Sequence, residues 1–91
     1  MEETRVALLG IVVENPDAVE PLNQLLHQYK DYIIGRMGLP YRARGVNIIS
    51  IVLDAPGDAI NSLSGKVGML PGVTAKAVYS KLPEPPPASA D

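Results

Sequence analysis

Two stretches of the chain are apolar at almost every position, namely Thr4–Val13 and Val46–Leu53. A strand with one face in water alternates apolar and polar side chains, whereas aliphatic side chains fall on both faces of these two stretches. The pattern therefore predicts two central strands that are apolar on both sides. Two helices can cover only one face of a small sheet, so another surface must cover the second face, most simply another copy of the chain.

The segment after the first strand has apolar residues at helical spacing, from Val19 to about Ile33. Asn15 is a good N-cap, Pro16 suits the first helical position, and Asp17 complements the positive end of the helix dipole. Pro21 removes a backbone donor soon afterwards. Either the first turn is distorted there or the regular helix starts later, and we expect a kinked or loose first turn.

A second helix is predicted around the apolar positions 60, 63, 67 and 70. Asp54 and Asp58 flank its start, and we interpret them as helix caps rather than as an acid–base pair. Gly68 is the expected C-terminal cap, and the Pro71–Gly72 pair ends the segment.

The two remaining strands, Tyr32–Leu39 and Val73–Lys81, contain glycines or charged residues that are typical of sheet edges. The turn-rich segment Pro40–Gly45 joins the second strand to the third as a hairpin. The order β-α-β-β-α-β predicts an α+β, ferredoxin-like fold: a four-stranded antiparallel sheet in the order 4-1-3-2, with two helices on one face. We expect one domain over residues 1–81 and a Pro-rich, disordered or polyproline-like tail over residues 82–91.

Charge and residue composition exclude several classes of function. The net charge of −2 gives no general attraction to nucleic acid or to an anionic membrane, and the absence of Cys excludes disulfides, thiol nucleophiles and Cys metal sites. The single histidine, His27, lies off the apolar stripe and is interpreted as structural. Without Phe or Trp, the sheet lacks the usual aromatic platform for RNA. We expect a cytoplasmic protein that is not an enzyme, has no metal or cofactor, and binds neither nucleic acid directly nor membrane.

Three arginines, Arg36, Arg42 and Arg44, gather in and beside the hairpin connection. Arginine holds carboxylates and phosphates in bidentate geometry, so this segment could contact an anion or a partner. A solvated hairpin tip that keeps a sheet edge soluble explains the same residues equally well, and the sequence leaves both alternatives open.

Several stretches together resemble a known family: the first strand running into V-V-E, then D-Y-I-I-G-R-M-G-L-P-Y-R, I-I-S-I-V-L-D-A-P and L-S-G-K-V-G-M-L-P-G-V. The chain resembles the small proteins described as iron-only hydrogenase system regulators, which have an ACT-like ferredoxin fold. The resemblance implies a non-enzymatic regulatory or accessory protein of an iron-only hydrogenase system. It covers nearly all of the chain except the tail.

The wider ACT group often binds amino acids or other small effectors between subunits, near the loop after the first strand. That loop here keeps a proline and replaces the group's usual glycine by an aspartate. The expected ligand-binding residues are those of this loop and of the arginine-bearing hairpin: Asn15, Pro16, Asp17, Arg36, Tyr41 and Arg42. The expected oligomer interface comprises aliphatic residues of the central strands: Leu9, Ile11, Ile48 and Val52.

Two functions follow. The first is a homo-oligomeric regulatory module in which the sheet faces or edges of neighbouring copies pack together, and in which a small effector could bind at the subunit seam. The alternative is an adaptor without a small-molecule ligand, which docks on a hydrogenase maturation or sensor protein through the second strand and its arginines.

Overall fold

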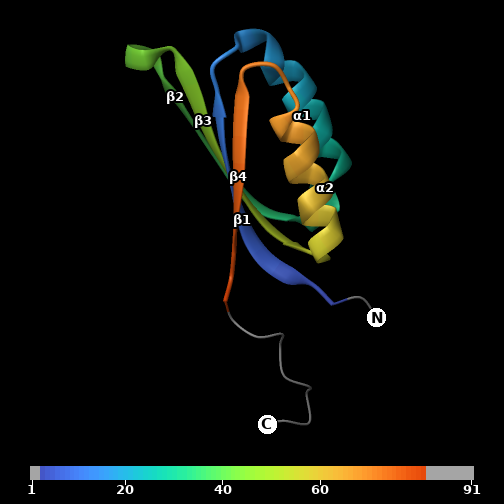
Figure 1. The fold of residues 1–91 in the computed structure, drawn as a ribbon. Coiled ribbons are helices and arrows are strands. Elements are labelled where there is room, and N and C mark those ends of the chain that lie inside the picture. The colour runs from blue at the N-terminus through green and yellow to red at the C-terminus, as the bar shows by residue number, and fades with distance from the viewer. Residues whose placement is uncertain (1–2, 82–91) are drawn as a thin grey trace, which may run out of the picture.

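The structure is a computed structural model, and it describes residues 3–81; the tail expected over residues 82–91 lies outside this range. Figure 1 shows a sheet with both α-helices on one side of it. The elements in chain order are β1 (Arg5–Val13), the 3₁₀ turn η1 (Pro16–Ala18), α1 (Val19–Gln28), η2 (Lys30–Tyr32), β2 (Ile33–Tyr41), η3 (Arg42–Arg44), β3 (Val46–Ala55), α2 (Gly57–Gly68) and β4 (Val73–Tyr79).

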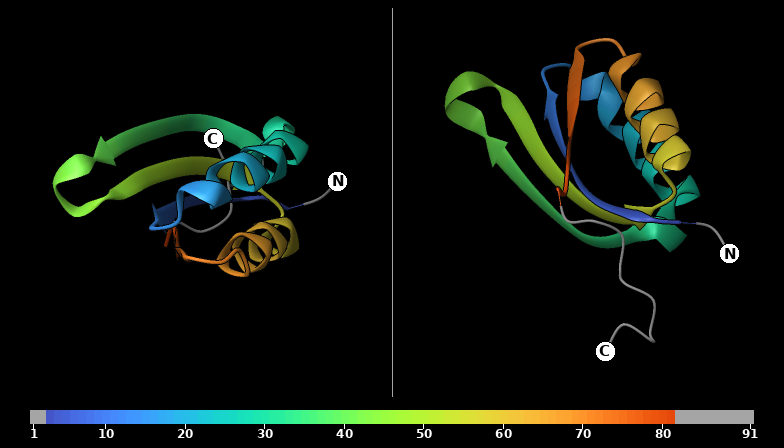
Figure 2. Two further views of the ribbon diagram at one scale, coloured as in Figure 1. Left: turned by 90° about the horizontal axis from the view of Figure 1, so that it is seen from above. Right: turned by 60° about the horizontal axis from the view of Figure 1, so that its bottom comes forward.

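The four strands form one antiparallel sheet in the order β2-β3-β1-β4. This is the predicted order 4-1-3-2 counted from the opposite edge, so the ferredoxin-like α+β fold is confirmed. The two apolar stretches are the central strands, and the strands with glycines and charges are the edges. Figure 1 and the view from above in Figure 2 show α1 and α2 side by side on one side of the sheet.

The first helix begins in two steps. The Asn15 side-chain oxygen Oδ1 accepts a hydrogen bond of 3.0 Å from the backbone N–H of Asp17, which caps the short turn η1. The regular helix α1 starts only at Val19, so Pro21 is its third residue. The first N–H groups of a helix have no intrahelical partner, and a proline is tolerated there. Of the two alternatives, the structure shows the later start of the regular helix, and the 3₁₀ turn η1 stands where a kinked or loose first turn was expected.

Two capping predictions for α2 are wrong. Pro56 occupies the N-cap position and no side chain makes a cap hydrogen bond, so neither aspartate caps the helix. Asp58 lies in the first turn, where its charge complements the helix dipole. Gly68 is still helical and is followed by Met69 in a right-handed conformation, so the left-handed residue is Gly72 instead.

In the hairpin between β2 and β3, the strand β2 is longer than predicted and the connection between the strands is shorter. β2 continues through Pro40 to Tyr41, and η3 with the left-handed Gly45 (φ 67°) closes the connection. Proline is compatible with an edge strand because its missing N–H can face away from the ladder. β2 also has the irregularity expected of an edge, a shift in register between Ile33 and Gly35.

The core lies between the helices and one face of the sheet. Leu22 and Leu26 of α1 and three residues of α2 pack against alternate residues of the central strands. The strand residues buried there are Ala7, Leu9, Ile11, Val13, Ile49, Ile51, Leu53 and Ala55. Because β1 pairs with β3 in register, each of these side chains has a cross-strand neighbour on the same face.

We expect Leu9→Ala to lower the free energy of unfolding by about 2–5 kcal/mol, because Leu9 is fully buried and its removal leaves a cavity. Met69→Ala is the control, since Met69 is 84% exposed at the end of α2, away from the sheet face on which a second chain would pack. It should cost at most about 1 kcal/mol. Urea denaturation at equal chain concentration measures both values, and similar losses at the two positions would contradict this packing.

Candidate functional site

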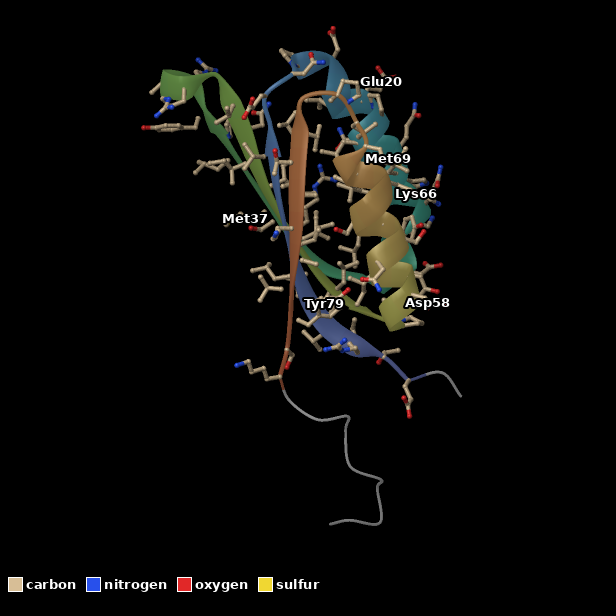
Figure 3. All side chains as sticks on the ribbon, in the orientation of Figure 1. Glu20, Met37, Asp58, Lys66, Met69 and Tyr79 are labelled. Atoms are coloured by element: carbon tan, nitrogen blue, oxygen red, sulfur yellow. The ribbon has the colours of Figure 1, made fainter. Side chains whose placement is uncertain are left out.

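The sheet face opposite the helices carries most of the exposed apolar side chains. We call it the bare face. Nine large apolar residues are exposed in the described part of the chain, and seven of them belong to this face by the strand register. They are Val6, Leu8, Met37, Leu39, Tyr41, Ile48 and Val78. Figure 3 shows Met37 on the side of the sheet away from Lys66 and Met69 of α2.

The register also shows where large and small side chains lie on the bare face. One row across the middle of the sheet consists of Met37, Ser50, Gly10 and Lys76. Small residues occupy the two central strands in this row. A Cβ placed on Gly10 would meet no atom closer than the carbonyl oxygen of Lys76, at 3.8 Å. The row is therefore low at its centre, with Lys76 as its one charged side chain.

The predicted interface residues divide between the two faces. Ile48 and Val52 lie on the bare face, where Val52 pairs with Leu8. Leu9 and Ile11 lie on the opposite face beneath the helices and are only 0% and 1% exposed. A second chain cannot contact these two residues in the folded protein, so the prediction for them is corrected. The residues of the same strand on the bare face are Leu8 and Val12.

The end of the β2–β3 hairpin, residues 41–46, extends beyond Pro40, Asn47, Val13 and Val73, which form the last row shared by all four strands. We call it the hairpin arm. Figure 1 shows that the arm leans away from the side that carries the helices, and Figure 2 shows its tip pointing away from them. Tyr41, Arg42 and Arg44 are exposed at or beside the tip. The arm therefore combines bare-face apolar residues with exposed guanidinium groups.

The loop after β1 is fixed against the start of β4. The backbone N–H of Glu14 donates to the carbonyl oxygen of Gly72 over 2.7 Å. Gly72 has φ 73°, and a Cβ added there would come within 2.6 Å of the Asn15 Cβ. Only glycine fits this approach without displacing the loop. Asn15, Pro16 and Asp17 are thus held in place by a neighbouring strand.

The six expected ligand residues do not form one site. Arg36 is on the helix-covered side of β2, where its Nη2 donates a 2.7 Å hydrogen bond to Oδ1 of Asn23 on α1. Tyr41 lies on the bare face opposite Val46. The loop residues are at the end of β1. Arg36 and Tyr41 are close in the sequence, but they are separated in the structure. The reason is that side chains alternate between the two faces along a strand.

One shallow groove does join the end of β1 to the arm. It has a volume of about 400 Å³ and is lined by Glu14, Arg44, Gly45 and Val46. Its lining therefore includes one carboxylate and one guanidinium. Sequence reasoning selected Arg42 and missed Glu14 and Arg44 as a pair. The antiparallel pairing of Val13 with Asn47 brings Glu14, which follows β1, close to the residues that precede β3. Knowing the register between β1 and β3 would have been enough to predict this neighbourhood.

Tyr29 forms a polar contact between the two helices. Its hydroxyl lies 3.1 Å from Oγ of Ser62 and accepts a hydrogen bond of 3.1 Å from Nζ of Lys66. The hydrogen bond with Ser62 is the main cause that lowers the pKa of Tyr29, and the hydrogen bond and positive charge of Lys66 act in the same direction. The contact ties the end of α1 to α2.

Within residues 3–81, no group of three His, Cys, Asp or Glu side chains is placed to hold a metal ion. No helix in this range is long and apolar enough to cross a lipid bilayer. His27 is exposed on α1.

The fold and the bare face define a small ferredoxin-like α+β domain with an unpartnered apolar sheet surface. The chain belongs to the TM1266-like family, described as "Iron-only hydrogenase system regulator, putative", whose model matches residues 5–77. This match runs from the first residue of β1 into β4 and confirms the resemblance inferred from the sequence.

A solved structure supports the same assignment. The uncharacterized protein TM1266 from Thermotoga maritima is 40% identical to this chain, with a TM-score of 0.83. The similarity covers 87% of this chain and 100% of TM1266. A search of curated proteins gives no significant match.

We expect Gly72→Ala to destabilise the fold more than Gly45→Ala. Both positions have positive φ, and an alanine there costs about 1–2 kcal/mol. Only at Gly72 does the added methyl also collide with Asn15, which should add at least about 1 kcal/mol. Thermal or urea unfolding measures both. Equal losses would show that the loop after β1 is not held against β4 as described.

The lowered pKa of Tyr29 should be visible as tyrosinate absorbance near 295 nm. The midpoint of its titration should lie below 10, and Tyr29→Phe should remove it. Lys66→Met should raise the midpoint, whereas Lys30→Met is a control that leaves it unchanged. Because the folded state favours the ionised phenol, this group adds stability fully above pH 10 and loses the contribution as pH falls through the lowered pKa. A midpoint insensitive to Lys66→Met would contradict the contact.

Proposed function

We propose that this chain is a non-enzymatic regulatory module of an iron-only hydrogenase system and works as a homo-oligomer assembled through the bare face. Membership of the family supports the regulatory role. The concentration of exposed apolar side chains on one sheet face is the observation that carries the proposed assembly. Contiguous apolar surface of this kind usually marks a site of protein interaction.

The size and charge of the bare face suit a second copy. Four strands 4.8 Å apart and about eight residues long have a projected area of roughly 500 Å², and side-chain relief raises the accessible area towards the ~800 Å² per partner of a standard interface. Lys76 is the one charged side chain in the middle of the face. Two such faces can therefore pack with little charge to desolvate, and a two-fold interface uses the same surface twice.

The proposed effector site is the groove between Glu14 and Arg44. It opens at the end of β1, beside Val46 of the bare face, so a chain packed on that face would cover it. A carboxylate and a guanidinium together suit a small polar molecule that carries charges of both signs. The alternative occupant of the bare face is a hydrogenase maturation or sensor protein.

We expect the wild-type chain to sediment as an oligomer at micromolar concentration. The double substitution Leu8→Lys and Val52→Lys should weaken assembly at least tenfold, because it places two charges inside the proposed interface. Met69→Lys is the matched control, since Met69 is 84% exposed at the end of α2, on the other side of the sheet. It should leave the sedimentation unchanged. Circular dichroism confirms that each variant is folded.

A wild-type chain that stays monomeric would refute self-association and would favour a different protein as the occupant of the face. An assembly that Met69→Lys disrupts as strongly as the bare-face pair would place the interface elsewhere.

A further inference from the structure

Opposite charges lie at the same end of the molecule on two separate elements. The tip of the hairpin arm carries the exposed arginines Arg42 and Arg44. The end of β1 and the start of α1 carry the exposed carboxylates of Glu14, Asp17 and Glu20. Figure 3 shows Glu20 at this end of α1. Since Arg44 and Glu14 of the same chain line one groove, Arg42 and Asp17 are the exposed pair of opposite charge considered for contact with a second copy.

The direction of the arm matters for a partner on the bare face. The arm leans away from the helices in Figure 1, so it leans into the space that a chain packed on the bare face would occupy. Its tip extends beyond the body of the sheet in both views of Figure 2. The arm can therefore extend alongside a chain that is packed on the bare face and contact it beyond the sheet.

Two identical sheets packed face to face with aligned strands are related by a two-fold axis between them. The axis can run across the strands or parallel to them. Across the strands, an axis through the middle row would place Lys76 of one chain over Lys76 of the other, two like charges in an apolar interface. Parallel to the strands, the axis exchanges the β2 and β4 edges, so Lys76 lies over Met37 of the second copy. The lysine stem can then pack on the thioether.

The parallel axis also brings together the charged ends. It keeps the arm end of one chain at the arm end of the other and moves each tip from the β2 edge to the opposite edge, above the loop that joins β1 to α1. We infer that the two copies clasp each other in this way, with Arg42 of each arm paired with Asp17 of the other chain. This inference rests on the proposed self-association through the bare face and specifies its geometry.

The axis across the strands makes a different pairing. It would carry each arm to the far end of the other chain, where Asp54 on β3 faces the bare side. Arg42 would then meet Asp54 rather than Asp17. The two geometries therefore differ in which carboxylate pairs with Arg42 and in which residue of the second copy lies opposite Lys76.

Cross-linking can distinguish the axes because the full chain has no cysteine, so every introduced thiol is unique. Packed sheets lie about 10 Å apart, beyond the reach of a disulfide, so a short bismaleimide is the probe. Mixed Met37→Cys and Lys76→Cys chains should form a cross-linked dimer in good yield. Lys76→Cys alone should give little product. Strong self-linking of Lys76→Cys would overturn the inference.

Charge reversal gives an independent test by sedimentation and native mass spectrometry. Arg42→Glu alone and Asp17→Arg alone should each weaken assembly about tenfold, because each homodimer then contains two like-charge contacts. A mixture of the two variants should recover wild-type affinity as a heterodimer, in which both contacts are again opposite in charge. Lys30→Glu, a charge change at the other end of α1, is the control and should have no effect.

The outcomes separate this inference from the proposed function. A monomeric wild-type chain would refute both. An oligomeric wild type in which Arg42→Glu is rescued by Asp54→Arg, or by neither partner, would overturn the clasped geometry and leave self-association through the bare face standing.

Discussion

A sheet that is apolar on both sides and a chain with only two helices constrain everything else in this protein. The helices cover one face and bury Leu9, Ile51 and their neighbours completely. The opposite face keeps Leu8, Ile48 and Met37 in contact with solvent. A domain of this size has no further element within its described residues to place there. The apolar side chains that make β1 and β3 strong central strands therefore also create the surface from which we infer assembly.

The fold could be predicted from the sequence because local composition and strand order agree. Residues apolar on both faces belong in the middle of a sheet, and glycines or charges belong at its edges. Because both faces of the central strands are apolar, the sequence did not indicate which face the helices would cover. When both faces are aliphatic, alternation cannot distinguish Leu8 from Leu9, and only packing against the helices decides. The interface prediction therefore mixed residues from the two sides.

Other errors have equally specific causes. Gly68 looked like a helix end because glycine often ends helices, but the tight approach to Asn15 requires glycine at Gly72. Arg36 looked like part of the hairpin cluster because it is close in sequence to Arg42, yet alternation and the distance along β2 separate them. The groove between Glu14 and Arg44 depends on register between strands that are distant in sequence, which a single sequence does not reveal.

The hydrogen bond from Arg36 to Asn23 divides β2 into two mechanically different parts. Residues before it are tied to α1, whereas the part beyond it is supported only by its pairing with β3. Arg36 is therefore the point at which β2 passes from a segment bonded to α1 to one that is held by β3. A displacement of β2 at this residue would strain the Arg36–Asn23 hydrogen bond.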